Sequence, residues 1–235
     1  MNIFNYESKF MQVMLTLSDM IIVNICYLIC CIPIVTISAA QAGLYTAIRS
    51  ITDEEDDRSA FKAFFRGFAD GIVTSSVAGT VVLIAQAISV WVFFYAYYYY
   101  GSNNSLLPLI LTIVIMAAIY ITHSLIGAFH SRFGCTIGQL IRNAFFVAFA
   151  YPLRSIAVGA LTLLPLAVLL IWPQIFMGGI IAILTIYYST AALLSSTLLK
   201  KPFARLEKNY NRALGIEDEE DDSEEAEETE ETNEN

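Results

Sequence analysis

Residues 24–45, NICYLICCIPIVTISAAQAGLY, decide the fold of this chain. They begin inside an apolar run, residues 11–32, which is 22 residues long and has Asp19 as its only charge. A bilayer core about 30 Å thick needs about 20 apolar residues in a helix, so this run can span a membrane. Pro33 then interrupts the helix, because proline lacks a backbone donor and clashes with the preceding turn. Backbone that breaks inside a membrane must be satisfied by protein or a wet cavity, so we expect this segment at the centre of the fold.

The residues of this break form the candidate structural and functional core. They are polar or small, or they cause the break itself: Asn24, Pro33, Thr36, Ala39, Ala40, Gln41, Gly43 and Tyr45. Two ionisable groups inside predicted spans are weaker candidates, because such groups are costly in lipid and often functional. Asp19 either reaches the headgroups or has a buried role. His123 lies between two hydroxyl residues and is the better histidine candidate, whereas His130 stands at a span end, where headgroup contact explains it.

Composition places the chain among membrane proteins. Apolar residues make up 57% and charged residues 15% of the 235 residues, and the mean hydropathy is +0.60. The formal net charge of −9 misleads, because residues 217–235 hold 13 of the 22 acidic side chains and no basic one. The rest carries 13 basic against 9 acidic residues. We therefore expect a mildly basic membrane domain, residues 1–215, and a disordered acidic tail, residues 216–235. Nothing indicates nucleic-acid binding.

The predicted fold is all-α, a polytopic bundle of five transmembrane helices with interfacial amphipathic helices. The spans are expected at residues 11–32, 71–100, 106–129, 153–171 and 176–199. Residues 34–50 are expected to be re-entrant or interfacial. If they cross as well, there are six spans, but a crossing of about 17 residues is at the lower limit of length.

The segment 60–70, AFKAFFRGFAD, has the clearest helical periodicity. Four phenylalanines follow an i, i+3, i+4, i+7 pattern, with charges on the other side: Phe61, Phe64, Phe65 and Phe68. We interpret it as an amphipathic helix on the membrane surface, with docking on a protein partner as the alternative. Small residues then recur every fourth position, which lets two helices approach closely: Gly67, Gly71, Ser75 and Gly79. Trp91 and the tyrosines of residues 95–100 indicate an interfacial aromatic belt in preference to a sugar-stacking platform.

Charge predicts the topology. Of the 13 basic residues, 12 fall between spans one and two, between or at the edges of spans three and four, or after span five, and the turns 101–105 and 172–174 have none. The positive-inside rule then puts the C-terminus in the cytoplasm. With five spans the N-terminus is outside, and with six it is inside. The basic residues after the last span favour an anionic cytoplasmic leaflet.

No motif for catalysis, metal or cofactor binding stands out. The chain has no HExxH, no GxxxxGK[ST] and no plausible Ser/His/Asp set. Cys26 and Cys30 share a helix face, yet buried cysteines usually serve as small apolar packing residues, and no disulfide framework is expected. A signal peptide is disfavoured because the apolar run is too long, contains Asp19 and precedes further spans.

Several segments of the sequence together form a family pattern. The first part comprises residues 5–11, Asp19, Asn24, the segment Pro33-Ile34-Val35-Thr36-Ile37 and four residues C-terminal to that segment: Ala39, Ala40, Leu44 and Tyr45. The later part comprises three short segments: Phe64-Phe65-Arg66, Arg132-Phe133 and Arg142-Asn143-Ala144-Phe145. In these segments the chain resembles the YesL family of bacterial membrane proteins, over about residues 1–210. Ser38 stands where glycine is expected, and the acidic tail exceeds the usual family end.

The resemblance implies a domain of unknown function, often associated with carbohydrate uptake of the ABC type, and no catalytic residues. We therefore expect a multi-pass plasma-membrane protein that is an accessory or regulatory component of such a system, with ABC sugar-transporter subunits as partners. The alternative is a self-sufficient small transporter or channel that acts as an oligomer. It would use the broken segment and polar groups such as Asn24, Gln41, Gln86 and His123. An enzyme is not expected.

Overall fold

The computed structural model describes residues 9–52, 59–100 and 106–214, and within them every regular element is a helix. The prediction of an all-α fold is therefore confirmed. The chain divides into two compact units, Met1–Thr197 and Leu198–Asn235. The predictions for the turn 101–105 and the acidic tail 216–235 concern residues outside the described ranges.

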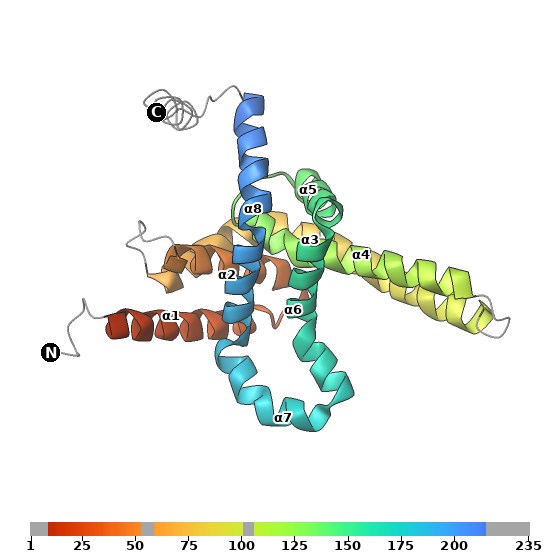
Figure 1. The fold of residues 1–235 in the computed structure, drawn as a ribbon, viewed down its shortest axis with the longest axis horizontal. Helices are drawn as coiled ribbons and strands as arrows, with labels where there is room; N and C mark the ends of the chain where they lie inside the picture. Colours follow the sequence, from red (N-terminus) through yellow and green to blue (C-terminus); the bar gives the residue numbers. More distant parts are fainter. Residues whose placement is uncertain (1–8, 53–58, 101–105, 215–235) are drawn as a thin grey trace, which may run out of the picture. The chain divides into compact units, whose positions relative to one another are not determined.

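Ten helical elements follow one another along the described chain (Figure 1). They are α1 (Lys9–Cys30), the 3₁₀ turn η1 (Ile34–Thr36), α2 (Ile37–Thr52), α3 (Ala60–Tyr100), α4 (Leu106–His130), α5 (Ile137–Ala150), α6 (Pro152–Ile171), α7 (Pro173–Ala182), the π-helical turn η3 (Ile183–Tyr187) and α8 (Tyr188–Leu214).

The break at Pro33 forms a turn between α1 and α2 whose backbone is satisfied from within. The Thr36 hydroxyl bridges the Cys30 carbonyl, at 2.7 Å, and the Pro33 carbonyl, at 2.8 Å. The outer side chains of the turn are apolar and exposed, with Ile32 at 78% and Ile34 at 70%. An exposed apolar patch of this kind suits a hydrocarbon or protein environment better than water. The turn therefore presents an apolar surface to its surroundings, and its re-entry into the membrane stays a prediction.

Helix α2 is the centre of the packed core, and small residues hold it there. Ten of its 16 residues are buried. It runs antiparallel to α3, with Thr46 against Gly67 and Ser38 against Gly79, and on another side Gly127 of α4 lies against Gln41. The small-residue ridge predicted in α3 thus faces α2. Because glycine has no side chain, these backbones come close enough to exclude other atoms.

Helix α3 joins two elements that the sequence predicted separately. The expected surface helix at residues 60–70 and the span at 71–100 form one helix of 41 residues. No proline interrupts it, and its first glycines sit at packing contacts with α2, where they do not break the helix. The phenylalanine face also divides: Phe64 is fully buried, whereas Phe61 is 47% and Phe65 42% exposed. The start of α3 therefore docks on protein through Phe64, and only part of the apolar face is left outside.

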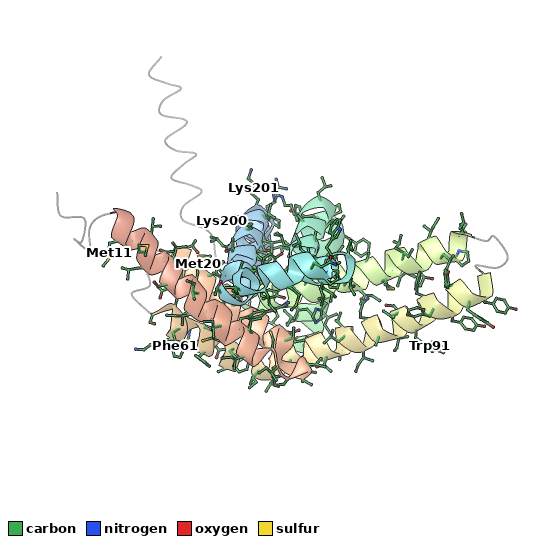
Figure 2. All side chains as sticks on the ribbon, turned by 90° about the horizontal axis from the view of Figure 1, so that it is seen from below. Met11, Met20, Phe61, Trp91, Lys200 and Lys201 are labelled. Atoms are coloured by element: carbon green, nitrogen blue, oxygen red, sulfur yellow. The ribbon has the colours of Figure 1, made fainter. Side chains whose placement is uncertain are left out.

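The far half of α3 pairs with the start of α4 in a hairpin that extends from the α2 core (Figure 1). Large apolar side chains on both helices are exposed there, including Trp91 at 70% and Leu107 at 77%, and Figure 2 shows Trp91 on the outer side of α3. Aromatic rings stack in a ladder along α3, with centroids 6.2 Å apart for Trp91 and Tyr95 and 6.0 Å for Tyr95 and Tyr99. This is the segment predicted as an aromatic belt.

Four helices of the described chain are long and apolar enough to cross a membrane: Met11–Cys30, Ala60–Tyr99, Leu106–His130 and Pro152–Ile171. They coincide with four of the five predicted spans. The fifth prediction, residues 176–199, is wrong as a single helix, because α7, η3 and α8 divide it. The π turn η3 changes the chain's direction here, as Figure 1 shows. At 16 residues α2 is shorter than a usual span.

The packing of α2 predicts a steep cost for a single added methyl group at Gly43. A Cβ atom there would lie 2.7 Å from the Phe64 carbonyl oxygen, a backbone atom that cannot rotate away. We expect Gly43→Ala to lower the stability in detergent by about 1–3 kcal/mol, the usual cost of overpacking. Thermal unfolding of the purified protein measures this cost.

Gly138→Ala is the matched control, because a Cβ at Gly138 of α5 meets nothing within 4 Å. Alanine favours helix more than glycine by up to about 1 kcal/mol, so this variant should unfold at the same or a higher temperature. Equal unfolding temperatures for the two variants would contradict a close α2–α3 contact.

Candidate functional site

A group of buried polar side chains lies on α2 and on the two helices that pack against it. We call it the α2 polar layer and define it by four residues: Ser38 and Gln41 of α2, Ser75 of α3 and His123 of α4. Ser38 is 1%, Ser75 0% and both Gln41 and His123 8% exposed. Three helices thus bring polar groups together where the surrounding chain is apolar.

The closest polar pair of the layer is Ser38 and His123, with Oγ 3.4 Å from Nε2. Gly79 of α3 lies against the same serine, and a Cβ there would be 3.8 Å from His123 Nε2. Two turns further along α4, His130 lies beside Gly71 and within electrostatic reach of Asp70. The two histidines therefore share the face of α4 that meets α3, as their seven-residue spacing predicts.

Several buried polar atoms of α2 and α3 have no hydrogen-bond partner in the part of the chain that the structure describes. They are Oε1 of Gln41, the hydroxyls of Ser75 and Ser76, and Oγ1 of Thr80. A buried polar atom without a partner costs free energy, so these atoms would gain from a bound water molecule or a polar ligand. The helices around α2 thus hold buried polar atoms whose hydrogen-bonding capacity is not used by the described residues.

The described residues contain no group of three or more His, Cys, Asp or Glu side chains that could hold a metal ion. Cys26, Cys30, Cys31 and Cys135 are all free thiols. Outside the apolar helices, burial raises the pKa of the Cys135 thiol, and a contact of 3.9 Å from Asn143 Nδ2 opposes this shift. A raised pKa keeps the thiol protonated, and a protonated thiol is a poor nucleophile.

Asn24 belongs to a second polar contact, between α1 and the start of α8. Its Oδ1 accepts the backbone N–H of Ser189 at 3.1 Å, and the Ser189 hydroxyl donates to the Met20 carbonyl at 2.7 Å. Asn24 and Ser189 are both fully buried. The π turn η3 just before Ser189 disturbs the regular N–H to carbonyl pairing of an α-helix. The Asn24 side chain therefore supplies a partner to a backbone group where water is excluded.

Pro165 leaves a backbone carbonyl of α6 without its helical donor, and the Tyr187 side chain supplies a donor in its place. Proline has no N–H, so the carbonyl four residues earlier, that of Leu161, loses its helical donor. The Tyr187 hydroxyl of η3 donates to this carbonyl at 2.6 Å. At the next residue of α6, the Tyr120 hydroxyl of α4 lies 2.9 Å from Thr162 Oγ1. These contacts join α4, α6 and η3.

The structure divides the predicted core residues among three places. Five of them lie buried on α2: Ala39, Ala40, Gln41, Gly43 and Tyr45. Pro33 and Thr36 form the turn before α2, and Asn24 lies at the α1–α8 contact. His123 joins Gln41 in the α2 polar layer, while Asp19 is half-buried on α1.

Ser38, Tyr187 and Ser189 were missing from the sequence-based core. Nothing local to Ser38 or Ser189 distinguishes either from other serines of the apolar helices, because their partners are 85 and 165 residues away along the chain. Pro165 did carry a usable signal, since it predicts an unpaired carbonyl at Leu161.

The Asn24 contact predicts a measurable loss of stability. Asn24→Ala leaves the buried Ser189 N–H without its side-chain acceptor, and an unsatisfied buried donor costs about 1–3 kcal/mol. Thermal unfolding in detergent should show a lower midpoint. Gln12→Ala is the control, because Gln12 is an exposed amide on the same helix and should leave the midpoint unchanged. Equal midpoints for the two variants would show that the Asn24 contact contributes nothing to stability.

Comparisons with known proteins add one similarity. No curated protein and no solved structure matches the chain. Residues 20–98, which run from α1 to the far end of α3 and include all of α2, match a family described as "Protein of unknown function, DUF624". The part of the chain similar to that family thus contains the turn, the α2 helix and the glycine contacts on α3 that build the core.

Proposed function

We propose that this multi-pass membrane protein is an accessory or regulatory subunit of a carbohydrate-uptake system of the ABC type. The observation that carries the proposal is the α3–α4 hairpin. It extends from the packed core, and large apolar side chains on both of its helices are exposed: Trp91, Phe94, Tyr98, Leu107 and Ile110. Such a surface suits packing against lipid and against the helices of a partner.

The burial of the polar side chains around α2 also supports an accessory role. Each member of the α2 polar layer is at least nine-tenths buried. A transport path needs polar groups that line an accessible cavity, whereas these are enclosed by close glycine contacts. We also propose that the chain is not an enzyme: Ser38 and His123 are spaced like a nucleophile and base, yet both are enclosed. The carbohydrate part of the proposal is supported by the resemblance of the IPIVTI segment and its surroundings to the YesL family.

We place the protein in the plasma membrane with its C-terminus in the cytoplasm, because the basic residues concentrate in the predicted cytoplasmic segments. A green fluorescent protein fused after residue 235 should then fluoresce, since it folds in the cytoplasm and not after export by the general secretory route. Alkaline phosphatase at the same position should be inactive. Active phosphatase with a dark fluorescent protein would reverse the topology.

Co-purification in mild detergent from the native cells tests the accessory role. We expect the tagged full-length protein to recover a sugar ABC permease or its binding protein in stoichiometric amount. Trp91→Ala should lower this recovery severalfold, because it removes a large exposed ring from the hairpin. Trp172→Ala is the matched control, an exposed tryptophan between α6 and α7 at 56% exposure, and should leave the recovery unchanged.

Recovery of the protein alone, as a defined oligomer, would overturn this proposal and favour a small transporter or channel. The unpartnered atoms of Gln41, Ser75, Ser76 and Thr80 support that second candidate, because they could bind water or substrate once the helices separate. In liposomes the oligomer should then show solute flux, and His123→Gln should reduce it.

A further inference from the structure

The second half of α8 carries a basic stripe that the proposed function leaves unexplained. Three basic side chains are exposed there, Lys200, Lys201 and Arg205, and Figure 2 shows the first two projecting from the helix. All three belong to the unit Leu198–Asn235, and they make the start of its helical segment strongly basic.

The sequence extends this stripe to the end of the helix. Four basic residues of α8 are spaced at intervals of four, three and four residues: Lys201, Arg205, Lys208 and Arg212. These intervals put all four positions on one face of an α-helix. Glu207 is the only acidic residue between Lys200 and Leu214. The face thus carries a net positive charge over about three turns.

The position of the stripe along the chain points to its partner. It directly follows residues 173–199, a stretch of 27 residues without a charged side chain. Lys and Arg that follow an apolar membrane segment lie at the level of the lipid headgroups. There they meet phosphate oxygens, with which Lys and Arg form charge-assisted hydrogen bonds.

We propose that the basic stripe of Lys201, Arg205, Lys208 and Arg212 binds the headgroups of anionic phospholipids. Binding is electrostatic and multivalent. It therefore weakens as the salt concentration rises, because screening shortens the range of each charge. The stripe would fix the end of α8 to the anionic leaflet whichever protein the α3–α4 hairpin contacts.

Lipid binding to the full-length protein tests this proposal. The purified protein is titrated in detergent with phosphatidylglycerol and, separately, with phosphatidylcholine, and bound lipid is counted by native mass spectrometry. We expect a preference for phosphatidylglycerol. The double variant Lys201→Gln/Arg205→Gln should weaken phosphatidylglycerol binding about 25-fold, because each basic group near an anionic surface contributes about fivefold.

The double variant Lys62→Gln/Arg66→Gln is the matched control. It removes the same two residue types at the same spacing from an exposed face of another helix, α3. It should leave the affinity for phosphatidylglycerol within about twofold of the parent protein, because residues 53–70 hold six acidic against three basic side chains and so carry a net negative charge. Equal weakening by both double variants, or by neither, would overturn the proposal.

The acidic segment 217–235 is the competing occupant of the stripe, since it holds 13 acidic residues on the same chain. A chain ending at Ile216 separates the two cases. Unchanged phosphatidylglycerol binding after truncation supports a lipid partner. A full-length protein that shows no preference and a truncated one that does would mean that the acidic segment occupies the stripe, and would overturn the proposal.

Discussion

The close contact of α2 with α3 and α4 is the constraint on which the rest of the structure depends. Inside a membrane, helices gain little from leaving lipid for one another, because both surroundings are equally apolar. Association must come from close packing, and close packing requires small residues. Glycines of α3 and α4 provide these contacts: Gly67, Gly71, Gly79 and Gly127. The facing residues of α2 contribute short side chains.

Close packing alone leaves a second problem, the backbone groups freed wherever a helix is irregular. Three irregularities of the apolar region each have a side chain that satisfies a backbone group. Thr36 serves the turn at Pro33, Asn24 serves the α8 start after the π turn, and Tyr187 serves the carbonyl freed by Pro165. In water these groups could be solvated, but in a bilayer they must be satisfied by the protein. The side chains of Thr36, Asn24 and Tyr187 are therefore explained by backbone needs, whereas the unpartnered atoms of the α2 polar layer are not.

Much of this architecture can be predicted from local sequence. Composition and run length predict an all-α membrane protein and the bounds of four long helices to within about three residues, apart from the early start of α3. Pro33 and the small residues after it predict the break and the buried segment.

The features that local sequence misses depend on distant contacts. The π turn within residues 176–199 is followed or accompanied by contacts with Leu161 and Asn24. The residues next to the turn in sequence do not predict these contacts. Phe64 and Phe65 are adjacent and identical, and only the position of α2 makes one buried and the other exposed.

The continuity of α3 has a mechanical consequence. A helix of 41 residues is about 60 Å long, and it has no proline at which to bend. Its first half packs closely against α2, while its second half forms one arm of the exposed α3–α4 hairpin. Such a helix acts as a lever with its fulcrum at the glycine contacts. A tilt of about 10° there would move a point about 30 Å further along α3 by about 5 Å. A shift of less than one side chain's width in the core would thus become a full side chain's displacement at the aromatic end.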